Sequence, residues 1–136
     1  MAIQDIANEI VALLRAGKDE EVGRRHWSPS VRSIEAAGQD PIADGPEAIA
    51  RKGEWFVANN EIHGVKAEGP FVNGDQFAVR LTYDMTPKDT GQRKTIDEVA
   101  LYTIADGKIV EERFFYGSQA ARVFLRIAPP ENSRRL

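Results

Sequence analysis

The chain has 136 residues, which is enough for one domain with a single hydrophobic core. Its 42% hydrophobic and 29% charged residues are typical of a soluble globular protein, and a net charge of −3 argues against nucleic acid or an anionic membrane as the main partner. The absence of cysteine excludes disulfide bonds, a thiolate nucleophile and cysteine-ligated metal. With no membrane-spanning run and no signal-peptide pattern, we expect a cytoplasmic protein.

The first half of the sequence predicts three helices. Apolar residues recur at steps of three and four over residues 3–14, which predicts a first helix that Gly17 ends. Residues 19–26 (DEEVGRRH) predict a short second helix, because acidic residues begin it and basic residues end it. Residues 44–47 (DGPE) are typical of a helix start, and this third helix is expected to run to about Asn59.

The remaining segments predict β-strands. They lie at residues 30–36, 62–68 and 71–85, with a turn at 73–75 inside the last, and on both sides of Asp106-Gly107. Helices followed by a long antiparallel meander indicate an α+β fold. A sheet that curls over helices leaves a conical cavity, and we expect the chemistry of the protein there.

The strongest local signal is Asp106-Gly107 between two runs rich in β-branched and aromatic residues. A two-residue turn there pairs Tyr102 with Glu111 and Glu98 with Phe115, since side chains alternate along each strand. One face then holds Glu98, Ala100, Tyr102, Ile104, Ile109, Glu111, Arg113 and Phe115. The opposite face holds an apolar set that predicts a dimer interface or a surface covered by the C-terminal tail: Val99, Leu101, Val110, Phe114 and Tyr116.

Several segments resemble a known family: residues 40–49 (DPIADGPEAI), 61–63 (EIH), 74–79 (GDQFAV), 98–102 (EVALY) and 106–116 (DGKIVEERFFY). They are similar to SnoaL-like members of the nuclear transport factor 2 (NTF2-like) superfamily, which also contains ketosteroid isomerase. The resemblance covers about residues 1–117 and leaves 118–136 as a C-terminal tail. It implies a cone-shaped α+β barrel, with N-terminal helices packed in a strongly curved antiparallel sheet, often dimerised through the outer sheet face.

The resemblance does not supply a mechanism. Polyketide-cyclase relatives use a histidine and an aspartate in the cavity, and their histidine–tryptophan pair falls on Glu112 and Arg113 of this chain. The histidine is therefore missing. The tryptophan position implies that Arg113, and with it Glu98 and Tyr102, faces the cavity.

Three residues are candidates for acid–base catalysis: Glu35, His63 and Glu98. Imidazole titrates near neutrality, although the position of His63 at the start of its strand favours a bond to backbone over a role in the cavity. A carboxylate such as Glu35, between apolar neighbours, is costly to bury unless it is paired or catalytic, but its face could also be solvent. Glu98 could act as a base or form a structural ion pair with Arg113.

Five residues are candidates for ligand binding: Trp55, Phe56, Tyr102, Arg113 and Phe115. Tyr102 would donate a hydrogen bond to a carbonyl or enolate oxygen, and Arg113 would hold an anionic or carbonyl group. We expect no metal and no cofactor, because two histidines 37 positions apart make no ligand pattern.

The cavity predicts a small-molecule-binding protein, and the resemblance implies a cofactor-free isomerase, dehydratase or cyclase that acts on an apolar carbonyl compound. The alternative is a non-catalytic binder or a dimeric interaction module of the same fold. A shifted carboxyl or histidine pKa inside a closed cavity would favour the enzyme. A filled cavity with Glu98 paired to Arg113 would favour the binder.

Overall fold

The computed structural model describes residues 2–38, 40–117, 120 and 123, and in this part the chain forms three helices and six strands. Their order is α1 (Ile3–Arg15), α2 (Asp19–His26), β1 (Trp27–Ile34), β2 (Ile42–Asp44), α3 (Pro46–Asn59), β3 (Asn60–Asn73), β4 (Gln76–Pro87), β5 (Lys94–Ala105) and β6 (Lys108–Phe115). The three predicted helices are confirmed. The short β2 lies outside the predicted strands, and β1 begins at Trp27, directly after α2, rather than at the predicted residue 30.

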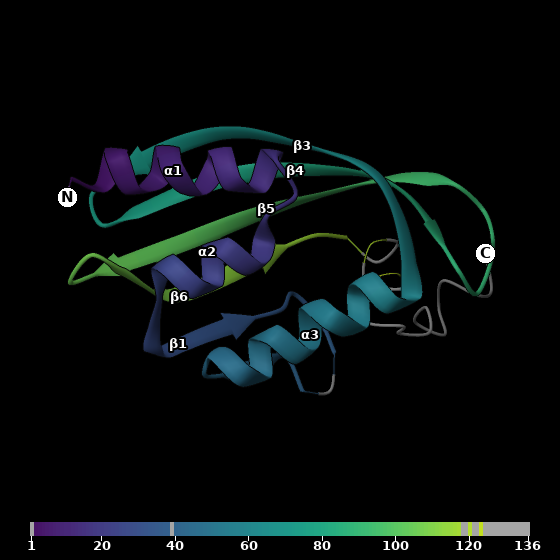
Figure 1. Ribbon diagram of the computed structural model, residues 1–136, viewed down its shortest axis with the longest axis horizontal. Helices are drawn as coiled ribbons and strands as arrows, with labels where there is room; N and C mark the ends of the chain where they lie inside the picture. Colours follow the sequence, from purple (N-terminus) through teal and green to yellow (C-terminus); the bar gives the residue numbers. More distant parts are fainter. Residues whose placement is uncertain (1, 39, 118–119, 121–122, 124–136) are drawn as a thin grey trace.

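Helix α1 lies along β3 and β4 and buries one apolar stripe against them (Figure 1). The buried side chains of this stripe recur at steps of one, three and four: Ile6, Ala7, Ile10, Val11 and Leu14. Gly17 follows the helix end with a φ of +69°, a conformation that a side chain would disfavour. The helix therefore ends where the sequence predicts.

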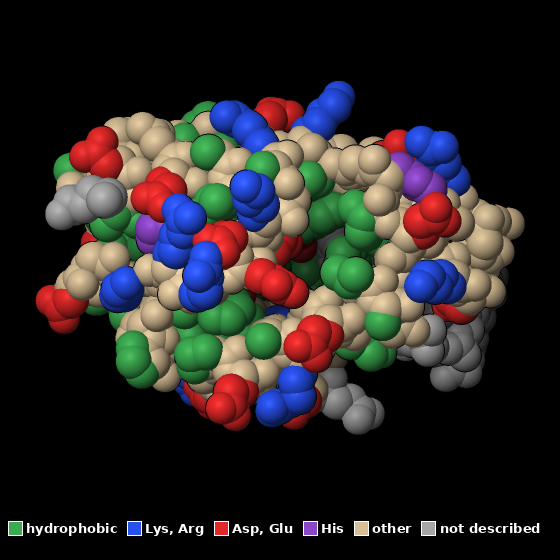
Figure 2. Space-filling model, in the orientation of Figure 1, with side chains coloured by type: hydrophobic (Ala, Val, Ile, Leu, Met, Phe, Trp, Pro, Cys, Tyr) green, Lys and Arg blue, Asp and Glu red, His purple; other side chains and the backbone are tan. Residues whose placement is uncertain are grey.

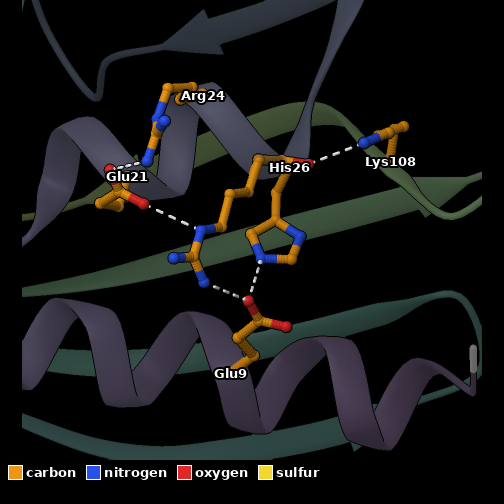
Figure 3. A network of polar contacts seen from close by, with 6 residues as sticks. Glu9, Glu21, Arg24, His26 and Lys108 are labelled. Carbon is orange, nitrogen blue, oxygen red and sulfur yellow. Dashed lines mark hydrogen bonds and ion pairs between the residues drawn. The ribbon is translucent and has the colours of Figure 1, made fainter.

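Charged side chains join α2 to α1 and to the β5–β6 turn (Figure 3). Glu9 of α1 accepts a 3.0 Å hydrogen bond from Nη1 of Arg25, and the same oxygen lies 3.5 Å from Nε2 of the buried His26. Arg25 also pairs with Glu21 at 2.8 Å. Lys108 donates a 2.7 Å hydrogen bond to the backbone oxygen of Arg25. These contacts fix α2 relative to both of its neighbours.

The six strands form one sheet in the order β2-β1-β6-β5-β4-β3. Neighbouring strands are antiparallel, except for the parallel pair β1 and β6. The sheet is strongly curved and the helices lie on one side of it (Figure 1). The α+β fold with helices in a curved sheet is therefore confirmed. Within the described residues β2 and β3 are sheet edges, so the sheet is not closed into the predicted barrel.

The β5–β6 hairpin turns at Asp106-Gly107, as the sequence predicts, but its register is different. Ala105 pairs with Lys108 and Ile104 with Ile109, and the next pair is Thr103 with Glu111. Val110 is an extra residue in β6, a β-bulge. From this point each β6 residue is shifted by one, and the predicted pairing of Tyr102 with Glu111 is wrong.

The bulge exchanges the two faces of β6 beyond Val110. Tyr102 pairs with Glu112 and Ala100 with Phe114, so Glu112 and Phe114 share the inner face with Glu98. Arg113 lies opposite Leu101, on the outer face.

The main core lies between α1 and the inner face of the sheet. Phe77, Val79 and Leu81 alternate along β4 and are at most 2% exposed, so they share its inner face. A second, smaller apolar cluster contains Met85, Ile96, Ala120 and Val123. Except for these last two residues, the predicted C-terminal tail (118–136) lies outside the described part of the chain.

Candidate active site

A cavity of about 960 Å³ opens between the helices and the inner face of the sheet. Figure 2 shows the face of the molecule hollowed between α2 and α3, with apolar and acidic side chains around the hollow. Among the described residues, six aromatic side chains contribute to its walls: Trp27, Trp55, Phe56, Tyr83, Tyr102 and Phe114. Its size and its mostly apolar walls are typical of a site for a small organic molecule.

Glu98 of β5 lies in the cavity wall and is 7% exposed. Burial and then the nearby charge of Glu35 raise the pKa of Glu98 to about 8, because a carboxylate without water is unstable and like charges repel. Its neighbour Tyr83 forms a side-chain hydrogen bond with it, and burial raises the pKa of Tyr83 well above its usual value. Glu98 is therefore mostly an uncharged carboxylic acid at neutral pH.

Glu112 of β6 is a second buried carboxyl group in the same wall, 6% exposed. Trp27 donates a 3.3 Å hydrogen bond from Nε1 to its Oε2, and Ser33 forms a further side-chain hydrogen bond to it. Burial raises the pKa of Glu112 to about 7, against the opposing effects of Lys52 and of these two hydrogen bonds. Ionised and neutral forms of Glu112 thus coexist near pH 7.

Glu35 follows the end of β1 and is held by two partners. Nζ of Lys52 lies 2.5 Å from its Oε1, and the hydroxyl group of Tyr116 donates a 2.6 Å hydrogen bond to its Oε2. Lys52 also lies 5.5 Å from the ring centroid of Phe114, within the range of a cation–π contact. Glu35 lines the cavity as one half of an ion pair with Lys52.

The aromatic candidates from the sequence also line the cavity. Trp55 and Phe56 come from α3, and Tyr102 comes from β5. The ring of Tyr102 stacks on Phe77 with 5.0 Å between centroids, and burial and then Glu112 raise the pKa of Tyr102 well above its usual value. Its hydroxyl group is therefore a permanent hydrogen-bond donor at neutral pH.

Two residues predicted to contact the ligand lie on the opposite face of the sheet. The side chain of Arg113 is 43% exposed and lies 3.6 Å from Glu111, and Phe115 is 49% exposed. Neither residue lines the cavity. The cause is the bulge at Val110, which turns both side chains outward. The predicted proximity of Arg113 to Glu98 is wrong for the same reason.

His63 also lies away from the cavity. It is exposed on β3, where its Nε2 lies 2.7 Å from Oγ1 of Thr86 on the neighbouring strand. The structure thus brings Glu35, Glu98 and Tyr102 together and leaves out His63 and Arg113. It adds Glu112, Lys52 and Trp27, which were not among the predicted site residues. The signal for Glu112 was present, because it occupies the position of the relatives' histidine.

A smaller hollow of about 870 Å³ adjoins the cavity and shares with it several lining residues, including Leu14, Phe56 and Tyr83. Asp19 and Glu20, at the start of α2, also belong to both and are exposed. The two spaces together form an opening with an acidic rim that leads to the buried carboxyl groups.

Neither a metal cluster nor a membrane span is found in the described ranges. No group of three or more His, Asp or Glu side chains there is arranged to hold a metal ion. Each helix in the same part of the chain is too short or too polar to cross a membrane.

Comparison with protein families gives a match over nearly the whole chain. The family model described as a SnoaL-like domain matches residues 1–116. The chain belongs to the SnoaL-like family. A search of curated protein sequences found no match.

Solved structures of similar proteins agree with this assignment. A Mesorhizobium loti protein, provisionally described as a SnoaL-like polyketide cyclase, is 45% identical, with a TM-score of 0.82 over 85% of this chain and 100% of that one. A protein from Jannaschia sp. CCS1 with the same provisional description is 23% identical (TM-score 0.70; 92% and 94% covered). An NTF2-like protein of unknown function from Burkholderia pseudomallei is 15% identical (TM-score 0.71; 90% and 96% covered). The last two show the fold alone, and this SnoaL-like chain has an NTF2-like fold.

Proposed function

We propose that this SnoaL-like protein binds an apolar carbonyl compound in its cavity and catalyses proton transfer at the carbon next to the carbonyl group. One observation carries the proposal. Two buried carboxyl groups, those of Glu98 and Glu112, line one cavity and have pKa values of about 8 and about 7. Groups that transfer protons work best when their pKa lies near the operating pH.

The two carboxyl groups differ in protonation, and this difference assigns their roles. Glu98 has the higher pKa, is mostly protonated at pH 7, and donates a hydrogen bond to the carbonyl oxygen. Glu112 has the lower pKa and a substantial ionised fraction, so it is the base. Tyr102, beside Glu112 on the same face, is a second donor toward the substrate oxygen.

The proton balance is simple. The ionised Glu112 takes a proton from the carbon, and the electron pair of that C–H bond forms a C=C bond to the carbonyl carbon. The π pair of the C=O bond moves to the oxygen, and the hydrogen bond from Glu98 stabilises the resulting enolate. The protonated Glu112 then returns the proton to the same carbon or to a conjugated one, which gives exchange or isomerisation. No cofactor takes part in these steps.

The alternative, a non-catalytic binder, has weaker support. Glu98 and Arg113 lie on opposite faces of the sheet and do not pair, and the cavity has room for a ligand. The name of the Mesorhizobium loti relative, a provisional polyketide cyclase, also favours chemistry at a carbonyl compound.

The test is hydrogen–deuterium exchange of a ketone in D₂O. The protein is incubated with cyclic aryl ketones such as 2-tetralone, and loss of the proton signal next to the carbonyl is followed by NMR. We expect exchange faster than in buffer alone, and we expect Glu112→Gln to reduce the enzymatic rate by about 10²-fold or more. Glu98→Gln keeps a hydrogen-bond donor, and we expect it to reduce the exchange rate less than Glu112→Gln does.

Three variants serve as controls. Glu111→Gln removes a carboxyl group next to Glu112 in sequence but on the outer face, and Arg113→Gln and His63→Asn remove predicted candidates that lie outside the cavity. All three are expected to keep the wild-type rate. Exchange no faster than in buffer for every ketone, or a Glu112→Gln variant as fast as Glu111→Gln, would refute the proposed function.

A further inference from the structure

Ser33 is a polar residue in the core, behind the wall of the cavity. It lies on β1, directly beside Glu112 in the parallel β1–β6 pairing, and is 0% exposed. It is absent from the cavity lining, so a ligand does not contact it. A hydroxyl group in such a place needs hydrogen-bond partners, since an unpaired buried polar group is costly.

The partners of Ser33 give its hydroxyl group a direction. Nζ of Lys52 donates a 2.8 Å hydrogen bond to Oγ of Ser33. An ammonium group only donates, so the Ser33 oxygen is the acceptor and its single hydrogen remains available. Ser33 and Glu112 lie side by side in the β1–β6 pairing, so that hydrogen is available to the Glu112 carboxylate, whose pKa a hydrogen bond from Ser33 lowers. The chain of donors therefore runs from Lys52 through Ser33 to Glu112.

We infer that Ser33 is a positioning residue that connects the charge of Lys52 to Glu112 and so keeps Glu112 ionised as the base. The catalytic consequence of this inference rests on the proposed function, whereas the bridge itself does not. A hydroxyl group that accepts a hydrogen bond from a cation becomes a stronger donor. The bridge thus favours the ionised form of Glu112 and leaves Glu98, which lies outside this chain of donors, as the acid.

Some of the other groups around Glu112 favour its ionised form, and others oppose it. Trp27 of β1 donates to it, and Lys52 of α3 attracts the ionised form. Burial and the charge of Glu35 oppose ionisation, and Glu98 of β5 interacts with it as a like charge. Tyr102 of β5 lies directly opposite Glu112 in the β5–β6 pairing and also interacts with its charge. Without the Ser33 bridge, burial and the charge of Glu35 are less opposed and raise the pKa of Glu112 further. We then expect this base to be protonated at neutral pH.

The test is to titrate Glu112 in Ser33→Ala by NMR of ¹³C-labelled glutamate side chains. Loss of a hydrogen bond to a charged group is expected to raise the midpoint by about 1 to 2 pH units. Ketone exchange at pH 7 should fall about tenfold and recover at pH 9, whereas a general loss of packing would lower the rate at every pH. Ser33→Thr keeps the hydroxyl group and is expected to restore the wild-type titration. Ser30→Ala, at an exposed position of the same strand, is the matched control without effect.

Lys52→Met tests the bridge from its other end, at a side chain that is 33% exposed and so less critical for folding. It should also raise the midpoint of Glu112, and the double variant with Ser33→Ala should shift it by less than the sum of the single shifts. An unchanged Glu112 titration in Ser33→Ala, or fully additive shifts, would overturn the inference. A shifted titration in a protein that exchanges no ketone would leave the bridge in place and refute only the proposed function.

Discussion

Gly23 lies directly against the indole ring of Trp27, so that a Cβ atom placed on Gly23 would come within 2.6 Å of the ring atom Cζ3. The same indole donates its N–H to Glu112. In an exposed helix, replacing glycine by alanine is stabilising by about 1 kcal/mol. At Gly23 we expect alanine to be destabilising, because the rigid indole ring must move to make room for the Cβ atom. Gly23→Ala should lower the melting temperature, measured by circular dichroism, and raise the NMR titration midpoint of Glu112.

Gly53 is the matched control for this prediction. It lies in α3, is exposed, and a Cβ atom placed on it would meet no atom within 4 Å. Gly53→Ala should therefore stabilise the protein by about 0.5 to 1 kcal/mol. Equal effects of Gly23→Ala and Gly53→Ala would contradict the close contact between Gly23 and Trp27.

The stability of the protein should depend on pH through Glu98. Its pKa is about 8 in the folded chain and about 4.5 as an ordinary glutamate, so between these values the folded state holds a proton that the unfolded state lacks. This contribution to the free energy of unfolding is complete below about pH 4.5 and is lost as pH rises to 8. Glu112 acts in the same direction up to about pH 7.

Glu98→Gln should remove much of this dependence. Between pH 5 and pH 9 the wild type is expected to lose on the order of 3 kcal/mol more than Glu98→Gln, measured by urea unfolding. The pKa values of Asp84 and Asp97 are lowered, chiefly by hydrogen bonds to Arg93 and to Thr82 respectively, and affect stability only at lower pH. Parallel curves for wild type and Glu98→Gln over pH 5–9 would show that Glu98 titrates normally.

The cavity should reject anionic ligands. Among the described residues that line it, six are acidic (Asp19, Glu20, Glu35, Glu54, Glu98, Glu112), and the single basic residue, Lys52, is paired with Glu35. A carboxylate placed there meets like charges and loses its hydration. We expect 2-acetylnaphthalene to bind at least about tenfold more tightly than 2-naphthoate at pH 8, measured by NMR titration. Equal affinity would mean that Lys52 is available to the ligand.

The predicted homodimer through the outer sheet face can be tested at two exposed apolar side chains. Val99 of β5 is 39% exposed, and Phe115 lies opposite it in the β5–β6 pairing. Exposed apolar groups that lie together favour association. If this face forms the dimer, Val99→Ser with Phe115→Ser should yield monomers in sedimentation experiments. Val57→Ser, at a 64% exposed position on α3, which lies on the helix side of the sheet, is the control that should keep the wild-type mass. The prediction fails if the wild type is monomeric at all concentrations.

The helices and the hairpin turn could be predicted because their signals are local. The residues that form the apolar stripe of α1 are close together in the chain, and so are the residues that form the Asp106-Gly107 turn. The parallel pairing of β1 with β6 joins residues about 80 positions apart, and no local pattern specifies it. That pairing places Ser33 beside Glu112, and therefore the hydrogen bonds of the base could not be predicted.

The site was only partly predictable for a similar reason. Glu98 and Tyr102 lie on β5, whose alternation is regular, and their inward direction follows from period two. The inner face of β6 depends on a bulge with no glycine or proline to mark it. Val110 is a β-branched residue that fits an ordinary strand position equally well.

The bulge at Val110 also means that one sequence has two possible registers in β6. If Val110 paired with Thr103, the ladder would be regular and Tyr102 would lie opposite Glu111. Arg113 and Phe115 would then point inward, and a guanidinium group would replace the base in the acidic wall. Deleting Val110 removes this alternative, because Glu111 then follows Ile109 directly and Glu112 stays opposite Tyr102. A chain shortened by this one residue should therefore keep its acidic wall in a regular ladder that has no competing register.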